Sequence, residues 1–155
     1  MKRVLSILLA LLLLAAPGCQ APLGEESTVV VNDLPGVYCE IVEGTLTPKG
    51  AEVRFWNALD REDLWTGPMH FLEIKYFGKW YNMDYHRKNP SIDGPWDTVA
   101  YPIFSDSSGR EYTHFYSWNA YYPLEPGHYR IVFPYHEGSG KTIKHHLLAT
   151  EFTIR

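Results

Sequence analysis

Residues 121–133, "YYPLEPGHYRIVF", place a tight bend directly before an alternating apolar segment. Pro126 presets its backbone angle and Gly127 can adopt a positive φ, so the chain is predicted to reverse there. From residue 129 to 133 every second side chain is Tyr, Ile or Phe. This period of two predicts a half-buried β-strand after the bend.

The same alternation recurs in "AEVRFWN", residues 51–57, and in "HFLEIKYF", residues 70–77. No helical stripe with caps is present, and Gly and Pro interrupt the chain at intervals of about ten residues. Short strands at this spacing favour an antiparallel sandwich or barrel. The side chains expected in its core are Val53, Phe55, Leu72, Ile74, Trp118, Ile131 and Phe152.

The bend formed by Leu124, Pro126 and Gly127 suggests a role for Tyr129, with its ring in the core and its hydroxyl bonded to the backbone of the bend. That arrangement is the tyrosine corner of immunoglobulin-like sandwiches. A plain turn followed by a core tyrosine is the alternative. We expect an all-β, immunoglobulin-like antiparallel β-sandwich of about seven strands.

The N-terminal sequence is typical of an export signal, because two basic residues precede an apolar run over residues 4–16. That run is shorter than the roughly 20 residues of a membrane-spanning helix. The following residues 16–19, "APGC", resemble a bacterial lipoprotein cleavage box, which implies acylation of Cys19. An ordinary signal peptide and a soluble product are the alternative.

The predicted organisation is a lipoprotein signal peptide over residues 1–18, a lipid-anchored tether over 19–35 and one domain over 36–155. Cleavage removes Lys2 and Arg3, so 14 minus 2 leaves 12 basic residues against 18 acidic ones, a net charge of −6. Such an acidic chain lacks the basic stripe that nucleic-acid binding requires. Cys39 is expected to be a buried free thiol.

Several motifs occur in a characteristic order: "TLTPKGAEVRFWN", "LEIKYFGKWY", "YSWNAYYPLEPGHYRIVF" and "EFTIR". In this order they resemble the bacterial immunoglobulin-like domain of small Gram-positive-type lipoproteins, over roughly residues 36–155. The resemblance implies this sandwich fold and a location on the extracytoplasmic face of the bacterial cell membrane. It implies no shared catalytic residues, so we expect neither enzymatic activity nor a cofactor.

Seven histidines raise the possibility of a metal site. His145 and His146 are adjacent on a predicted strand, so they point to opposite faces and cannot chelate one ion together. A site built from distant residues, for example His114, His128 and His136, stays possible. The alternative function is therefore a metal-binding lipoprotein or a metal-dependent enzyme.

Two further patterns favour plain turns. "EGSGKT", residues 137–142, ends like a phosphate-binding loop, but the first glycine of that motif is missing and a strand follows. Asp60, Glu62 and Asp63 offer oxygen ligands for calcium, yet the spacing lacks the frame of a known calcium loop.

Aromatic side chains are the remaining signal for a function. The loop "HRKNPSIDGPWD", residues 86–97, combines a basic pair with a tryptophan. Rigid aromatic rings in loops suit saccharide or peptide recognition. We expect a monomeric, non-catalytic binding or adaptor module for an unknown envelope protein or glycan. Its candidate binding surface comprises Arg87, Lys88, Trp96, Tyr101 and Tyr122.

Overall fold

The computed structural model describes residues 23–84, 100–121, 123–138 and 142–155. Within these residues the chain is nearly all β, and the helix that is described over its whole length is a short 3₁₀ turn, η1 (Asp106–Ser108). None of the described helical residues forms a segment with the length and apolarity needed to cross a bilayer.

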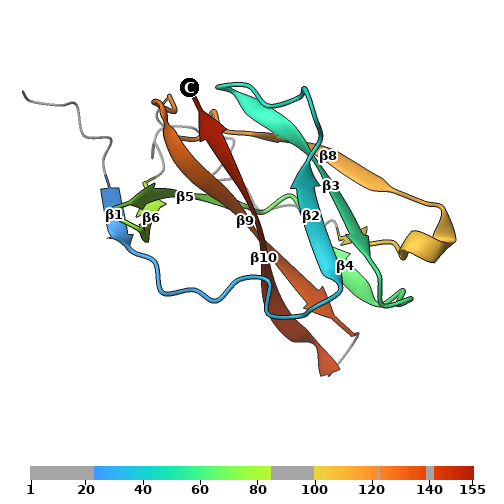
Figure 1. The fold of residues 1–155 in the computed structure, drawn as a ribbon. Coiled ribbons are helices and arrows are strands. Elements are labelled where there is room, and N and C mark those ends of the chain that lie inside the picture. Colours follow the sequence, from blue (N-terminus) through green and yellow to red (C-terminus); the bar gives the residue numbers. More distant parts are fainter. Residues whose placement is uncertain (1–22, 85–99, 122, 139–141) are drawn as a thin grey trace, which may run out of the picture.

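Two antiparallel sheets, of seven and three strands, form a sandwich (Figure 1). The larger sheet has the order β1 (Leu23–Glu26), β6 (Lys79–Met83), β5 (Phe71–Tyr76), β9 (Gly127–Glu137), β4 (Leu64–Thr66) and β7 (Tyr101–Pro102), and β10 (Lys144–Ile154) pairs with β9 over its whole length. The smaller sheet has the order β2 (Val37–Ile41), β3 (Gly50–Asn57) and β8 (Tyr112–Ser117).

The predicted all-β antiparallel sandwich is confirmed, with more strands than expected. The surplus comes mainly from β1, β4 and β7, which have four, three and two residues. Segments this short cannot display a period of two in the sequence.

The core lies between the two sheets and contains the side chains that the alternation predicted. All seven are buried: Val53, Phe55, Leu72, Ile74, Trp118, Ile131 and Phe152. Because successive residues of a strand point to opposite faces, each of these side chains that lies in a strand leaves a neighbour on the outer face of its sheet.

The bend before β9 has the hydrogen bond of a tyrosine corner. The Tyr129 hydroxyl donates to the carbonyl oxygen of Glu125 at 2.7 Å, and burial raises the pKa of Tyr129 to about 12. Leu124 is buried in the same core cluster as Tyr129. Gly127 does not adopt the expected positive φ. Glycine relieves crowding instead, because a Cβ there would lie 3.1 Å from the Tyr129 ring, closer than an ordinary contact.

The β5–β6 hairpin turns one residue earlier than the Gly78-Lys79 turn that the sequence suggests. Tyr76 pairs with Lys79, so Phe77 and Gly78 form the two-residue loop, with φ values of 47° and 81°. Positive φ at both central positions is the type I′ geometry that matches strand twist, and a glycine at the second position favours it. Phe77 is fully exposed at the tip.

The N-terminal segment differs from the predicted tether, because residues 23–35 lie on the sandwich. β1 pairs with β6, and Asn32 bonds to the edge of β10 through its backbone and side chain. Residues 27–33, here called the strap, therefore cross the outer face of the larger sheet, as the blue chain in Figure 1 shows. These contacts use backbone groups and one amide, which leave no hydrophobic pattern in the sequence.

Candidate functional site

Two neighbouring recesses lie at the η1 end of the sandwich. The first, the sheet recess, has a volume of about 380 Å³ and lies over the outer face of β3; its lining is Arg54, Trp56, Asp106, Gly109, Arg110 and Glu111. The second, the edge recess, has a volume of about 230 Å³ and lies beside β4 and β7, with Trp65 and Phe104 in its lining. Arg110 lines both recesses, so they adjoin at that side chain.

Strand β3 supplies the floor of the sheet recess. Arg54 and Trp56 alternate with core residues and so share the outer face of the strand. Tyr38 of β2 lies opposite Trp56 in the sheet, and the two rings stack with centroids 5.4 Å apart. The Arg54 guanidinium lies 4.9 Å from the centre of the Trp56 ring. Trp56 is therefore held between two neighbours and needs little ordering before it meets a ligand.

Arg54 is paired with two carboxylates across the sheet. Its guanidinium lies 2.5 Å from Glu40 and 3.2 Å from Glu111, and the charge of Glu40 is the main cause of its raised pKa. All three side chains are more than a third exposed, so solvent screens these pairs. The pairs set the orientation of the guanidinium more than they stabilise the fold.

Buried Asn57 ties the walls of the edge recess together. Its amide nitrogen donates to the carbonyl oxygens of Ile103 and Arg61, at 2.7 and 3.1 Å. Its amide oxygen accepts from the backbone nitrogens of Leu59 and Arg61. A fully satisfied buried amide of this kind fixes the turn after β3 against the segment that follows β7.

Asp60 holds η1 in place from the same turn. Its carboxylate accepts hydrogen bonds from the Ser105 and Ser107 hydroxyls at 3.1 and 2.5 Å, and these bonds, Ser107 first, lower the pKa of Asp60. Gly109, with a φ of 64°, ends η1 and directs Arg110 toward both recesses.

The polar groups around Arg110 are available to a ligand. The guanidinium lies 4.3 Å from the centre of the Phe104 ring, and its nearest carboxylate, Glu62, is 3.5 Å away, at the limit of a hydrogen bond. No described residue forms a hydrogen bond with the Asp106 carboxylate or the Trp56 indole N–H. The recesses thus offer aromatic surface, the Asp106 carboxylate as an acceptor and the Trp56 N–H as a donor, and a ligand at Arg110 would compete only with the long contact to Glu62.

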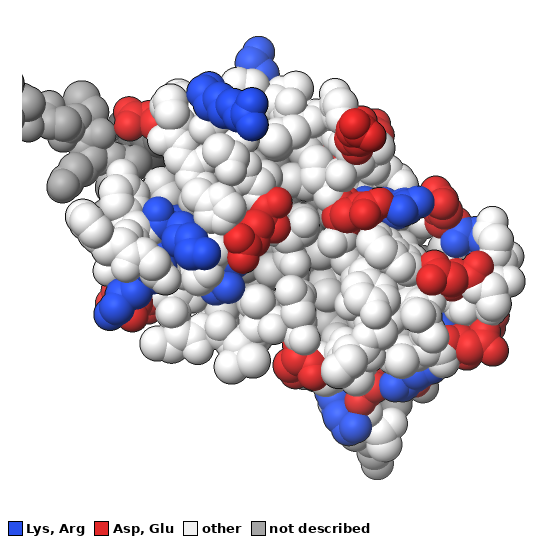
Figure 2. Space-filling view, in the orientation of Figure 1, with Lys and Arg blue, Asp and Glu red and all other residues white. Residues whose placement is uncertain are grey.

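The charges at this end are mixed in sign. Figure 2 shows acidic and basic side chains interspersed at the right-hand end, where η1 lies in Figure 1. In the sheet recess the cations Arg54 and Arg110 face the carboxylates of Asp106 and Glu111. A site with this balance has no electrostatic preference for a highly charged ligand.

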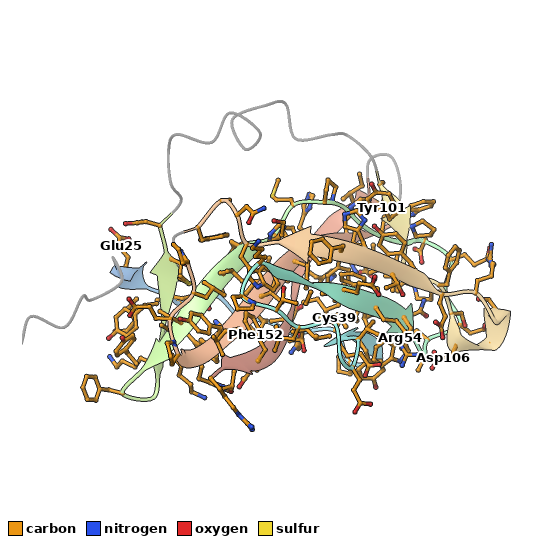
Figure 3. The ribbon with its side chains drawn as sticks, turned by 90° about the horizontal axis from the view of Figure 1, so that it is seen from above. Glu25, Cys39, Arg54, Tyr101, Asp106 and Phe152 are labelled. Atoms are coloured by element: carbon orange, nitrogen blue, oxygen red, sulfur yellow. The ribbon has the colours of Figure 1, made fainter. Side chains whose placement is uncertain are left out.

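The recesses lie far from the first strand. Figures 1 and 3 place β1 and η1 at opposite ends of the molecule, and Figure 3 labels Glu25 at one end and Asp106 at the other. A contact made at β1 therefore does not cover the end of the molecule that carries the recesses.

Among the described residues, no group of three His, Cys, Asp or Glu side chains could hold a metal ion. The histidines of the alternative metal site have separate surroundings: His128 bonds to Glu151, His114 lies against Tyr101, and His136 lies near His145. The carboxylates of the calcium hypothesis likewise have different partners, since Asp60 bonds to serines, Asp63 to Arg61 and Glu62 to Arg110.

The structure describes one residue of the predicted binding surface, Tyr101. It was expected to be exposed but is half-buried, because pairing of β7 with β4 brings its ring onto Tyr112, 4.7 Å away. The other predicted site residues lie outside the described residues: Cys19, Arg87, Lys88, Trp96 and Tyr122.

The recess residues were missed as a site, although the sequence held part of the signal. The alternation in residues 51–57 already places Arg54 and Trp56 on the outer face of β3. Their neighbours Asp106 and Arg110 come from a distant segment, which the register of β3 with β8 and the turn after β3 bring there.

Cys39 is a free thiol on the inner side of β2, and it is partly buried against the core where full burial was expected. Burial is the main cause of its raised pKa, and the neighbouring Glu40 carboxylate raises it further. Because the thiolate is the nucleophile, such a thiol is unreactive, and Cys39 serves as a small apolar side chain.

Searches for similar proteins found no match among protein-family models, curated proteins or solved structures. The resemblance to the bacterial immunoglobulin-like family stays a prediction from the sequence, and function is inferred from the geometry of the site.

Proposed function

We propose that the protein is a lipid-anchored, extracytoplasmic binding module without enzymatic activity, and that its ligand, an envelope protein or glycan, binds at the sheet recess. One observation carries this proposal: aromatic, cationic and acidic side chains from β3, η1 and the segment between η1 and β8 converge on an open recess. Concave sites that combine ring surface with a few oriented polar groups are typical of ligand binding.

The short link between the anchor and the sandwich supports a presenting role. Three residues separate Cys19 from Leu23, the first residue of β1. Because an extended residue spans at most about 3.5 Å, a lipid on Cys19 would keep β1 within roughly 14 Å of the membrane surface. The recess end, opposite β1, would then face away from the membrane.

Recovery from cell-envelope extract tests the binding function. Immobilised mature protein is compared with Trp56→Ala and Arg110→Ala, and Phe77→Ala is the matched control because this exposed aromatic lies on the β5–β6 hairpin. We expect both recess variants to recover less material and the control to behave as wild type. Protease treatment of the extract separates a protein ligand from a glycan. Equal recovery by all four proteins would exclude the recess.

Membrane fractionation tests the anchor. Two acyl chains give stable membrane residence where one is marginal, so Cys19→Ala should move the protein to the soluble fraction. Identical partitioning of variant and wild type would contradict lipidation at Cys19.

A further inference from the structure

We infer that the ligand is a neutral oligosaccharide that lies across Arg110 and occupies both recesses. This inference rests on the proposed binding function and adds the chemical class of the ligand and its path over the surface.

The shared position of Arg110 argues for an extended ligand. The sheet recess, of about 380 Å³, lies near the lower end of the roughly 300–1,000 Å³ typical of small-molecule sites, and the edge recess, of about 230 Å³, lies below it. Neither recess encloses a large ligand by itself. A chain of small rings can place one ring in each recess and cross the Arg110 side chain between the two.

The charge balance argues for a neutral ligand. Arg54 is already paired with Glu40 and Glu111, and Arg61 in the edge recess is paired with Asp63 and Glu137. The whole chain carries a formal net charge of −4. These carboxylates would repel a polyanion, and the recesses have no surplus of cations to attract it. Arg110 would repel a polycation.

The remaining groups match the surface of a sugar. A pyranose ring has an apolar C–H face and a rim of hydroxyl groups that both donate and accept hydrogen bonds. Trp56, Trp65 and Phe104 supply apolar ring surface along both recesses. The planar groups of Asp106 and Arg110 can each bond two adjacent hydroxyls, which adds geometric selectivity.

Arg110 is held in a suitable orientation for this task. Its guanidinium packs on the Phe104 ring, while its side chain is 57% exposed and so can reach solvent-side hydroxyls. Stacking reduces the freedom that the side chain would lose on binding. Trp56 is restrained in the same way by Tyr38 and Arg54.

Calorimetric titration with defined sugars tests the inference. The probes are the tetrasaccharides of cellulose, chitin and starch, the matching disaccharides, and a sulfated tetrasaccharide as the anionic comparison. We expect at least one neutral tetrasaccharide to bind about tenfold or more tightly than its disaccharide, since the longer chain reaches the second recess. No binding of any neutral tetrasaccharide at millimolar concentration, or tighter binding of the sulfated one, would overturn the inference.

Variants locate the sugar on the surface. Trp65→Ala should lower tetrasaccharide affinity about tenfold, whereas Arg110→Ala should weaken both tetrasaccharide and disaccharide binding. Because Trp65 is partly buried, the melting temperature of the Trp65→Ala variant is measured first, and Trp65→Phe replaces it if it unfolds. The exposed Asp106→Asn is the second variant in the sheet recess. Phe77→Ala is the control and should bind as wild type. Unchanged affinity in Arg110→Ala and Asp106→Asn would place the sugar elsewhere.

The two proposals fail differently. If recovery from envelope extract depends on the recess but no neutral sugar competes, the binding function stands and the saccharide inference falls. If recovery does not depend on the recess, both fall. Recovery abolished by protease would identify a protein ligand and would also overturn the saccharide inference.

Discussion

The outer faces of the two sheets carry the same combination of arginine, glutamate and tryptophan, but only one of them is covered. On the larger sheet, the Arg130 guanidinium lies 4.5 Å from the centre of the Trp80 ring and pairs with Glu73. The strap crosses this cluster, and Ser27 donates a hydrogen bond to Glu73 at 2.6 Å. The side chains of Arg130 and Glu73 are 9% and 0% exposed.

The cluster on the smaller sheet has similar geometry without a cover. Arg54 lies 4.9 Å from the centre of the Trp56 ring and pairs with Glu40, and these two charged side chains are 37% and 47% exposed. Burial thus separates two roles for one set of side chains. A covered ion pair is part of the packing, because neither partner can be solvated alone, whereas an open one contributes little and is available to a ligand.

The largest effect is expected from Glu73→Ala. The substitution leaves the Arg130 charge buried beneath the strap without its partner, which should lower the free energy of unfolding by about 3–5 kcal/mol. Chemical denaturation monitored by tryptophan fluorescence measures the change.

Removal of both charges is the control for that experiment. A Glu73→Leu/Arg130→Leu double variant leaves no unpaired charge, so it should be much more stable than Glu73→Ala. If Glu73→Ala unfolds at the same denaturant concentration as wild type, the strap does not seal this face.

A smaller effect is expected where the strap meets β10. The Asn32 side chain accepts from the backbone nitrogen of Ala149 at 2.8 Å and donates to its carbonyl oxygen at 3.2 Å, so it mimics a paired strand at an open edge. Asn32→Ala should cost about 1–2 kcal/mol of unfolding free energy through these two bonds. Asn32 has a φ of 58°, which asparagine tolerates better than alanine. Asn32→Gly also removes the side-chain bonds and avoids that strain, but it makes the unfolded chain more flexible, so the two variants together bracket the contribution of the bonds.

The next effect tests the corner, which lies away from both outer faces. Tyr129→Phe removes the bond to Glu125 and should lower the free energy of unfolding by about 1 kcal/mol. The exposed Tyr38, whose hydroxyl bonds to no described residue, is the matched control, and Tyr38→Phe should leave stability unchanged. If Tyr129→Phe leaves the free energy of unfolding unchanged, packing alone holds the corner.

The comparison also explains what the sequence could reveal. The core and the corner were predictable, because a period of two and a short bend motif are local signals, as Phe55 and Tyr129 show. The strap was not, since backbone groups and the scattered polar side chains of Ser27, Asn32 and Asp33 hold it, and these leave no periodic pattern. The recess escaped prediction because the link between Trp56 and Arg110 depends on strand register and on the turn that Asn57 and Asp60 hold.

The smallest effect on stability is expected from Glu40→Ala, the counterpart of Glu73→Ala on the open face. Arg54 keeps its contact with Glu111 and its position over Trp56, and water solvates the charge that Glu40 leaves behind. The denaturation midpoint should therefore stay within the scatter of ordinary surface substitutions. Tetrasaccharide affinity should stay within about twofold, since Glu40 is not part of the recess lining. If Glu40→Ala instead destabilises the protein as much as Glu73→Ala, the open cluster stabilises the fold. Its exposure is then no longer an argument for ligand binding at the recess above it.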